Sequence, residues 1–473
     1  MSTRALRSLP AVQAVLQHPH LEPALRMLPR PLVVEAVRAE IAQERARLRA
    51  GIRPPADAGE LAARASARAT RERKPQLVRV LNATGVVLHT NLGRAPLSET
   101  ARRAVDDVAR GYSSLEFDLQ TGRRGERGPG VERWLARLTG AEAALVVNNG
   151  AAALLLALSA LASGRSVIVS RGELVEIGGS FRIPDVMAKS GANIVEVGTT
   201  NRTHLRDYER AFAQRKDVAA VLRVHPSNFR IAGFTHRPPL EDLARLARRR
   251  HVPLIEDLGS GALVDLSAFG LEREPTVRES LTAGCDLVTF SGDKLLGASQ
   301  AGLVLGRRRW VERARRDPLA RALRVDKLTL ATLEATLPSY DDPARAAAEI
   351  PALAMLSASS EGLERRARAL AEALGREAPG LKVTVEPGSG EVGGGALPLQ
   401  RLPGWVVAVE DPERSANELQ SLARRADPPV IGYIRRGKWY LDVRTLIDDE
   451  IFEAAHALSR AHREDRGPAD PRH

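Results

Sequence analysis

The sequence predicts an α/β fold with a mostly parallel sheet, preceded by a helical N-terminal domain and followed by a small α+β domain. From about residue 76 to residue 330, short apolar runs of strand composition alternate with helical stretches. This alternation is typical of a parallel sheet with helices on both faces. The predicted strands are Ala144–Val147, Ser166–Val169, Asn193–Val197, Ala219–Val224, Pro253–Glu256, Asp286–Phe290 and Leu303–Leu305.

Residues 1–75 are predicted to be a helical domain with a linker. Pro10 and Pro31 each start an apolar helical pattern, and proline is tolerated in a first helical turn because the N–H that it lacks has no partner there. The Ala/Arg-rich stretch 52–74 is expected to supply a linker and one more, exposed helix.

Residues 331–465 are predicted to form the small α+β domain. The glycine-rich segment Gly388–Gly395 is expected to be a flexible loop, and the polar tail 466–473 is expected to be disordered. The predicted strands of this domain are Val383–Val385, Val406–Val409, Val430–Tyr433 and Trp439–Val443.

The composition is that of a globular protein with more than one domain. The 473 residues are 44% hydrophobic and 27% charged. No apolar run approaches the roughly 20 residues that a membrane helix needs, and no secretory signal is recognisable, so we expect a cytoplasmic protein. Cys285 is the only cysteine, which excludes an intrachain disulfide, and a buried structural thiol is expected. No Cys/His cluster has metal-ligand spacing, so no metal is predicted.

The chain is strongly basic, with a formal net charge of +12 and a pI of about 10.4. Such an excess favours a polyanionic partner. Of the 70 basic residues, however, only seven are lysine, and this arginine bias with alanine richness is also typical of a high-GC genome. Charge alone therefore leaves nucleic acid binding open.

Lys294 is the most informative residue. It follows the apolar run that ends at Ser291, inside a small, polar turn. A buried lysine is costly unless its amine has a role, and a Schiff base with pyridoxal phosphate is a common one. Ser291 suits a contact with the cofactor's phosphate. The alternative is a solvated lysine after a strand.

Two further strand ends support this hypothesis. Asn149, Gly150 and Ala151 lie between an apolar strand and an Ala/Leu-rich helix, so free N–H groups at the helix N-terminus can bind a phosphate. Asp257 ends another buried strand and can pair with the protonated pyridine nitrogen. Glu256 competes for that role, but strand alternation places it on the opposite face. Ordinary turns are the alternative at both places.

The order of these motifs narrows the class. Asn149 precedes Asp257 by 108 residues, and Asp257 precedes Lys294 by 37. The order is a turn that can bind phosphate, then an acid for the ring nitrogen, then the lysine. This order resembles that of the aspartate-aminotransferase-like (fold type I) enzymes that use pyridoxal phosphate.

Other polar segments can complete a site. Leu81–Arg94 is dense in polar and glycine residues, and Arg94 can hold an anion. His225, Ser227 and Asn228 follow a strand and can face the cofactor, although a capped turn is the alternative. Arg321 and Arg324 are three residues apart, so on a helix they share one face, either as an anion site or as a solvated basic face.

Together these segments resemble bacterial selenocysteine synthases, the L-seryl-tRNA(Sec) selenium transferases, over most of the chain. Two departures are Gly150 and Ser299, where Asn and Pro are expected. The segments that carry the resemblance are Leu81–Arg94, Tyr112–Asp118, Val147–Ala153, Ser170–Phe181, Gly198–Asn201, His225–Phe229, Glu256–Gly261, Ser291–Gly297 and Gly393–Pro398.

The resemblance implies conversion of L-seryl-tRNA(Sec) to selenocysteinyl-tRNA(Sec) through an aminoacrylyl intermediate on pyridoxal phosphate, with selenophosphate as donor. It implies that Lys294 and Asp293 are catalytic, and that Arg94, Arg321 and Arg324 bind the donor anion. Asp257, Asn149, Gly150, Ala151, Ser291 and Asn228 are the predicted cofactor contacts. It also implies tRNA contacts through the N-terminal domain and a homo-oligomer, a ring of dimers such as a decamer.

Two other functions stay open. A pyridoxal phosphate lyase or transferase acting on a small amino acid would use the same scaffold, but usually lacks an N-terminal tRNA-binding unit. An inactive tRNA-binding scaffold would not need Lys294, Asp257 and the phosphate turn.

Overall fold

The computed structural model describes residues 8–466, except 53, 74, 178–180 and 448. The chain forms two compact units, Met1–Arg79 and Val80–His473. The predicted disordered tail, apart from Arg466 at the end of the last helix, lies outside the described residues.

The N-terminal unit is helical, as predicted. Its longest helix, α4, packs against α5 through buried Val37, Leu61 and Ala65. The last helix was expected to be exposed, but its apolar face lies in this core because Leu and Ala recur there at helical spacing. The helices of the unit are α2 (Val12–Leu16), α3 (Glu22–Met27), α4 (Arg30–Arg49) and α5 (Ala58–Arg73).

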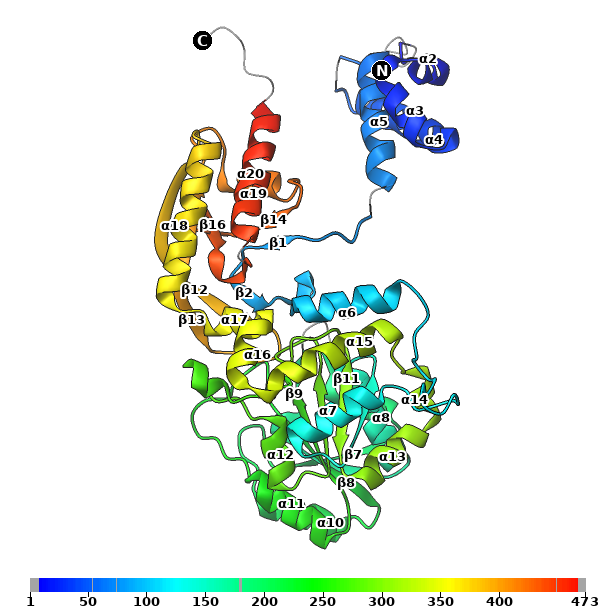
Figure 1. Ribbon diagram of the computed structural model, residues 1–473, viewed down its shortest axis with the longest axis vertical. Coiled ribbons are helices and arrows are strands. Elements are labelled where there is room, and N and C mark those ends of the chain that lie inside the picture. The colour runs from blue at the N-terminus through cyan, green and yellow to red at the C-terminus, as the bar shows by residue number, and fades with distance from the viewer. Residues whose placement is uncertain (1–7, 53, 74, 178–180, 448, 467–473) are drawn as a thin grey trace. The chain divides into compact units, whose positions relative to one another are not determined.

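A seven-stranded sheet forms the centre of the second unit (Figure 1). Its order is β3-β11-β10-β9-β8-β4-β7, and β11 alone runs antiparallel to its neighbours within this sheet. All seven strands were predicted, with ends within a few residues. They are β3 (Ala143–Val147), β4 (Ser166–Ser170), β7 (Asn193–Val197), β8 (Val218–Val224), β9 (Leu254–Gly259), β10 (Leu287–Ser291) and β11 (Gly302–Gly306).

Both faces of this sheet are buried, because apolar side chains alternate between two cores. Ile168 and Leu303 face one core, and their neighbours Val167 and Val304 face the other. The helices on the first face include α7 (Pro129–Thr139), α10 (Leu205–Gln214), α11 (Leu240–Arg249) and α12 (Val277–Ala283). Those on the second are α8 (Gly150–Ala162), α9 (Ile183–Lys189) and α13 (Arg308–Arg316).

Further helices lie outside the two faces of the sheet. They are α6 (Glu99–Ala109), α14 (Pro318–Ala322), α15 (Lys327–Thr336), α16 (Pro343–Glu349) and α17 (Pro351–Ser357). Of these, α6 precedes the first strand of the sheet and packs against α15, and the others follow its last strand.

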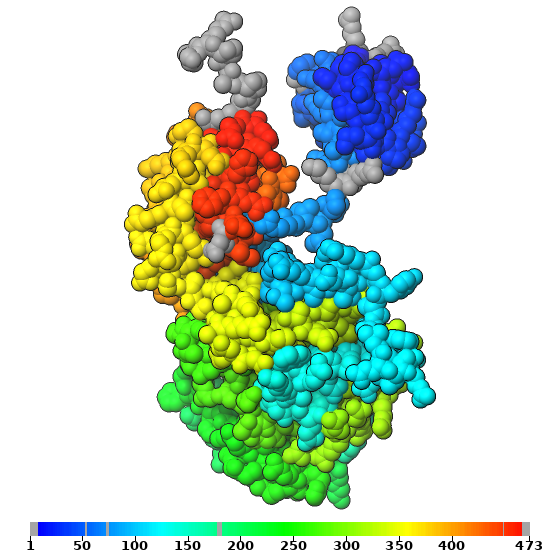
Figure 2. All heavy atoms as spheres, viewed as in Figure 1, coloured from blue at the N-terminus to red at the C-terminus, as the bar shows by residue number. Residues whose placement is uncertain are grey.

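A five-stranded sheet, ordered β15-β16-β13-β12-β2, forms the C-terminal region. The helices α18 and α20 lie side by side on it, as the yellow and red segments of Figure 2 show. The elements are β2 (Val86–Leu88), β12 (Lys382–Gly393), β13 (Arg401–Glu410), β15 (Tyr433–Arg435), β16 (Lys438–Asp442), α18 (Ser360–Glu377), α19 (Ala416–Ala423) and α20 (Glu450–Arg466).

The glycine-rich segment is not the flexible loop that was expected. Residues up to Gly393 belong to the long strand β12, which pairs with β13 and β2. A side chain at Gly388 would collide with Val406, so glycine serves close packing here.

The start of the second unit also pairs with its end. The short strand β1 (Leu81–Asn82) adds to β14 (Val430–Ile431), and β2 adds to β12. These two strands were assigned by sequence to the range 76–330 of the large domain. The predicted domain boundaries stay a prediction.

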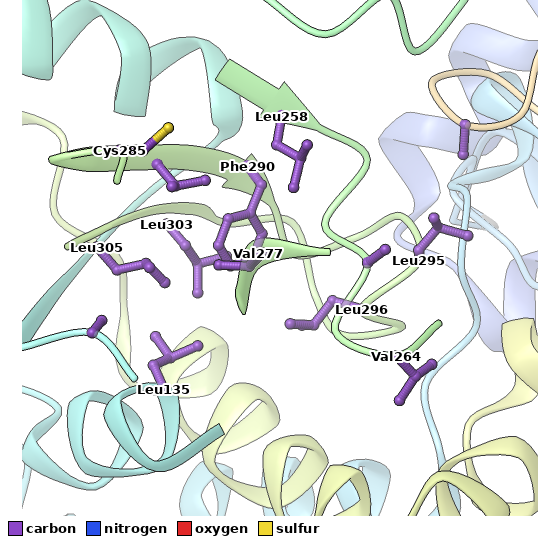
Figure 3. Packing of buried hydrophobic residues seen from close by; sticks show 14 of the residues in the cluster. Leu135, Leu258, Val264, Val277, Cys285, Phe290, Leu295, Leu296, Leu303 and Leu305 are labelled. Atoms are coloured by element: carbon purple, nitrogen blue, oxygen red, sulfur yellow. The ribbon is translucent and has the colours of Figure 1, made fainter. Parts of the chain in front are cut away.

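A close-packed core lies directly beneath the C-terminal end of β10 (Figure 3). Phe290 is fully buried there, together with Val277 and Leu303. Leu295 and Leu296, the two residues after Lys294, are buried in the same core. The turn that carries the lysine is therefore anchored by apolar packing.

A substitution at Gly302 can test the contact between β11 and the turn after β3. A Cβ there would collide with the Asn149 carbonyl oxygen and crowd Ala153. We expect Gly302→Ala to lower the free energy of unfolding by about 1–3 kcal/mol, measured by urea denaturation. The matched control is Gly375→Ala within α18, where a Cβ meets nothing within 4 Å and helix propensity should raise stability by up to about 1 kcal/mol. Equal effects of the two changes would contradict this contact.

Candidate active site

Lys294 lies in a rigid, buried turn. Only 5% of the surface of Lys294 is exposed. The Tyr340 hydroxyl lies 3.0 Å from the carbonyl oxygens of both Leu295 and Leu296. This buried contact and the apolar anchors fix where the amine lies.

Burial shifts the Lys294 amine toward its neutral form. Burial is the main cause of its lowered pKa, and the nearby positive charge of Arg94 lowers the pKa further. The carboxylates of Asp257, Asp293 and Glu274 act in the opposite direction. A neutral amine is the form that attacks a carbonyl carbon or accepts a proton.

Asp257 lies on β9, next to β10. The Thr289 hydroxyl donates a hydrogen bond of 2.8 Å to its carboxylate. Burial raises the pKa of Asp257 to about 6, against the opposing effects of the Thr289 hydrogen bond and the Lys294 charge. Glu256 instead lies 3.6 Å from the Cys285 sulfur. The two acids thus contact different neighbours, and Asp257 is the one near Lys294.

The turn after β3 has the geometry of an anion site. Asn149 caps α8, and its side chain accepts the Ala152 N–H at 2.8 Å. The N–H groups of Gly150 and Ala151 lie in the first helical turn, where no helical carbonyl is available. A Cβ at Gly150 would lie 2.5 Å from the Ser291 hydroxyl oxygen. The structure therefore brings Gly150 and Ser291 into close contact at the helix N-terminus, where free N–H groups can bind an anion.

The segment after β12 forms another wall beside the lysine. A Cβ at Gly395 would lie 2.5 Å from the Lys294 nitrogen. Gly395 also lines a pocket of about 470 Å³, together with His89, Asn91 and Asn228. This pocket therefore reaches Gly395, the residue that lies against the Lys294 amine.

Asn228 and Ser260 carry buried polar atoms without a hydrogen-bond partner among the described residues. The Asn228 amide nitrogen donates to the Glu176 carbonyl oxygen at 3.1 Å, whereas its side-chain oxygen is one of these atoms. The Ser260 hydroxyl is the other. An unpaired buried polar atom such as that of Asn228, which lines the pocket, is expected where a ligand supplies the missing partner.

Arg94 and Asp293 form an ion pair of 2.9 Å beside Lys294. Arg94 has a φ of 65°, a conformation that costs a non-glycine residue free energy. The second oxygen of Asp293 is buried and has no hydrogen bond to any residue that the structure describes. The pair therefore places one positive and one negative charge near the Lys294 amine, and the two act on its pKa in opposite directions.

Arg321 and Arg324 do not line the pocket beside Lys294. Both are exposed and line a second pocket of about 300 Å³ with Arg315. Arg324 forms a backbone bridge with Val147, close to the phosphate turn. Among the described residues, Arg315 pairs with acids, whereas Arg321 and Arg324 have no ion pair.

The residues present fit pyridoxal phosphate. A phosphate turn, a buried lysine and a buried acid at neighbouring strand ends correspond to the three attachment points of that cofactor. In the part of the chain that the structure describes, no group of three or more acidic, His or Cys side chains could hold a metal. No described helix is long and apolar enough to cross a membrane.

Sequence reasoning missed three residues of this site. Thr289 is a polar residue inside an apolar strand run, a signal that could have indicated its role. Gly395 lies in Gly393–Pro398, a segment that carries the resemblance, but no role followed from it, and Tyr340 gave no signal. Both reach the lysine from segments far along the chain, 101 and 46 residues after it.

This fold and site define the class of fold type I pyridoxal phosphate enzymes. A solved structure described as D-glucosaminate-6-phosphate ammonia-lyase superposes with a TM-score of 0.54 at 19% identity, covering 81% of this chain and 96% of that one, which supports the fold.

The chain belongs to the L-seryl-tRNA selenium transferase family, whose model matches residues 80–447. A second model, for the N-terminal part of selenocysteine synthase, matches residues 6–45.

Two bacterial relatives extend the match over nearly the whole chain. The L-seryl-tRNA(Sec) selenium transferase of Geobacter sulfurreducens is 51% identical over 453 residues, 95% of this chain and 98% of that protein. The protein of the same name from Moorella thermoacetica is 49% identical over 464 residues, 97% of each chain.

Asp257 allows a test of its burial in the cofactor-free protein. Its folded pKa of about 6 exceeds the ordinary value of 3.8, so the ionised carboxylate destabilises the fold above pH 6. The penalty disappears as the pH falls through 6 toward 4 and is at most about 3 kcal/mol. We expect Asp257→Asn to raise the thermal midpoint at pH 8, to keep about half of this gain at pH 5 and to lose most of it by pH 4.

The same variant should bind pyridoxal phosphate less tightly, because it lacks the charge for the ring nitrogen. A gain in stability that does not vary with pH would contradict the buried carboxylate.

Proposed function

We propose that this chain converts L-seryl-tRNA(Sec) to L-selenocysteinyl-tRNA(Sec), with pyridoxal phosphate as cofactor and selenophosphate as selenium donor. The observation that carries the proposal is the buried Lys294 beside Asp257 and a phosphate turn, in a chain of the selenium transferase family.

Each part of the site has a role in this proposal. Bound pyridoxal phosphate supplies an electron sink for the amino acid's Cα. Asn149, Gly150, Ala151 and Ser291 hold its phosphate. Asp257 holds the proton of the ring nitrogen, and Asn228 contacts the cofactor from the pocket side.

Lys294 carries the cofactor and then moves protons. Its amine, shifted toward neutrality by burial and Arg94, takes the proton from Cα of the seryl group. Asp293, held by Arg94 at 2.9 Å, assists the departure of the hydroxyl. Protonation of that hydroxyl is needed because hydroxide is a poor leaving group, and the proton comes either from Lys294, which returns the one it took from Cα, or from water through Asp293.

The selenium donor is a multivalent anion, which needs cations that are not already neutralised. Arg321 and Arg324 meet this requirement, since they are exposed and have no ion pair among the described residues. Arginine also matches the geometry of phosphate oxygens better than lysine does. Arg94, whose charge Asp293 only partly balances at 2.9 Å, is the third proposed contact of the donor, on the lysine side.

The tRNA contact is assigned to the N-terminal unit. Exposed arginines on α4 and α5 include Arg30, Arg38, Arg45, Arg49 and Arg71, and arginine-rich surfaces bind phosphate backbones. Assembly into a homo-oligomer, a ring of dimers, is part of the same proposal.

A single assay tests the reaction. The protein with pyridoxal phosphate is incubated with selenophosphate and either Ser-tRNA(Sec) or Ser-tRNA(Ser), and the amino acid released from each tRNA is identified. We expect selenocysteine from Ser-tRNA(Sec) only, and none with Lys294→Ala. Serine unchanged on both tRNAs, with cofactor visibly bound, would instead indicate an enzyme of small amino acids.

Reversal of charge at the second pocket tests donor binding. We expect Arg321→Glu and Arg324→Glu each to raise the KM for selenophosphate at least tenfold, because each loses a charge-assisted contact and adds repulsion. The absorbance of bound pyridoxal phosphate should stay unchanged. The control is Arg316→Glu on α13, an arginine that does not line this pocket. Loss of cofactor absorbance in the two variants would show a structural role instead.

A further inference from the structure

The pocket of about 470 Å³ beside Lys294 has an inner and an outer end. Its inner end includes Gly395, which is buried and lies against the Lys294 amine. Thr90, Asn91 and Leu399 line the same pocket and are exposed. A ligand in this pocket can therefore extend from the amine to the surface of the protein.

The proposed substrate has to extend in this way. In seryl-tRNA the serine is esterified to the ribose of the 3′-terminal adenosine, so only the ester carbonyl carbon and one oxygen separate Cα from the sugar. When Cα lies at the Lys294 amine, the terminal nucleoside must occupy the space next to it. The volume of about 470 Å³ falls within the roughly 300–1,000 Å³ of small-molecule sites. The pocket is therefore of a size that suits a nucleoside.

The charges of the pocket suit an uncharged ligand. Its lining contains one arginine and one acid, Arg401 and Glu391, which lie opposite each other on β13 and β12 and form an ion pair. Neither charge is left over to bind an anion. The pocket lined by Arg321 and Arg324 differs, since these two arginines have no ion pair among the described residues. The two pockets therefore suit different parts of the proposed reaction, a nucleoside in the first and the anionic donor in the second.

One wall of the first pocket is held in a costly backbone conformation. Leu397 has a φ of 46°, which is unfavourable for a residue with a side chain. It is kept there because its side chain is buried in the main core and its carbonyl oxygen accepts the Gln400 N–H at 3.0 Å. The Gln400 side-chain oxygen in turn accepts the Glu272 N–H at 2.8 Å. Strained residues that the surrounding structure anchors in this way are typical of ligand sites.

The outer end offers the two kinds of contact that a nucleoside needs. Leu399 is apolar and 61% exposed, so its side chain can pack against a face of the planar base. The Asn91 side chain has no hydrogen bond to a residue that the structure describes, and an amide group both donates and accepts. A ribose hydroxyl also donates and accepts, and adenine carries donors and acceptors on its edges.

We infer that this pocket binds the 3′-terminal adenosine of seryl-tRNA, with Leu399 packed on the base and Asn91 hydrogen-bonded to the nucleoside. The inference rests on the proposed function and deepens it, because it assigns a place to the part of the substrate next to the serine. The body of the tRNA is not needed for these contacts, so a single nucleoside should make them.

A pair of small ligands tests the inference by binding alone. One is 3′-deoxy-3′-(L-serylamino)adenosine, in which a stable amide replaces the ester, and the other is L-serinamide, which lacks the nucleoside. Their dissociation constants for the full chain loaded with pyridoxal phosphate are measured by isothermal titration calorimetry. We expect the adenosine conjugate to bind about tenfold more tightly than serinamide, because it adds an apolar contact and hydrogen bonds.

Two variants locate this preference. Leu399→Ala and Asn91→Ala should each reduce it about threefold, because each removes one contact of the nucleoside. The dissociation constant of serinamide should not change. The matched control is Leu77→Ala, since Leu77 is 95% exposed and does not line the pocket. This control and Arg324→Glu in the second pocket should both keep the wild-type preference.

Three outcomes would overturn the inference. The first is equal affinity of the wild-type protein for the two ligands. The second is a preference that both Leu399→Ala and Asn91→Ala retain. The third is a preference that Arg324→Glu loses and the other two variants keep, which would place the nucleoside in the second pocket.

The measurement needs neither selenophosphate nor turnover, so it is independent of the test of the proposed function. The expected preference, with no selenocysteine formed from Ser-tRNA(Sec), would reject the proposed function and leave the nucleoside site in place. Selenocysteine formed by a protein that shows no preference for the conjugate would reject the inference alone.

Discussion

The site depends on the burial of two ionisable groups, Lys294 and Asp257, at neighbouring strand ends of one sheet. Burial moves the pKa of the amine down and that of the acid up. Each shift favours the neutral form. For the lysine this is useful, because a neutral amine is the reactive form. For the aspartate it opposes the proposed pairing with a charged ring nitrogen, so the neighbourhood has to restore the charge.

The surroundings meet these two opposite needs with different residues. Arg94 adds a positive charge near the lysine, while its own charge is partly balanced by Asp293 at 2.9 Å. Thr289 supports the charged aspartate through a hydrogen bond of 2.8 Å. The packing behind the site keeps these distances short, because Leu295 and Leu296 are anchored in the core and Tyr340 contacts the same turn.

Small residues allow the segments of the site to approach one another closely. Gly150 lies against Ser291, and Gly395 lies against the lysine amine, where even a methyl group would collide. The same requirement explains why the glycine-rich segment is a strand and a wall of the site, and not the loop expected from its composition. The glycine content shows only that the backbone of this segment could be flexible. Its pairing with β13 and β2 holds that backbone in a strand.

The sequence by itself determined the α/β class and the seven strands of the main sheet, and it indicated Lys294, Asp257 and the turn after β3 as candidates for the site. It could do so because hydrophobic periodicity and strand-end polar residues are local signals. Only the tertiary structure decided that Thr289, Tyr340 and Gly395 surround the site, and that Arg321 and Arg324 line a different pocket from Arg94. These contacts join segments far apart in the chain, and they follow from strand register and core packing, which no local pattern encodes.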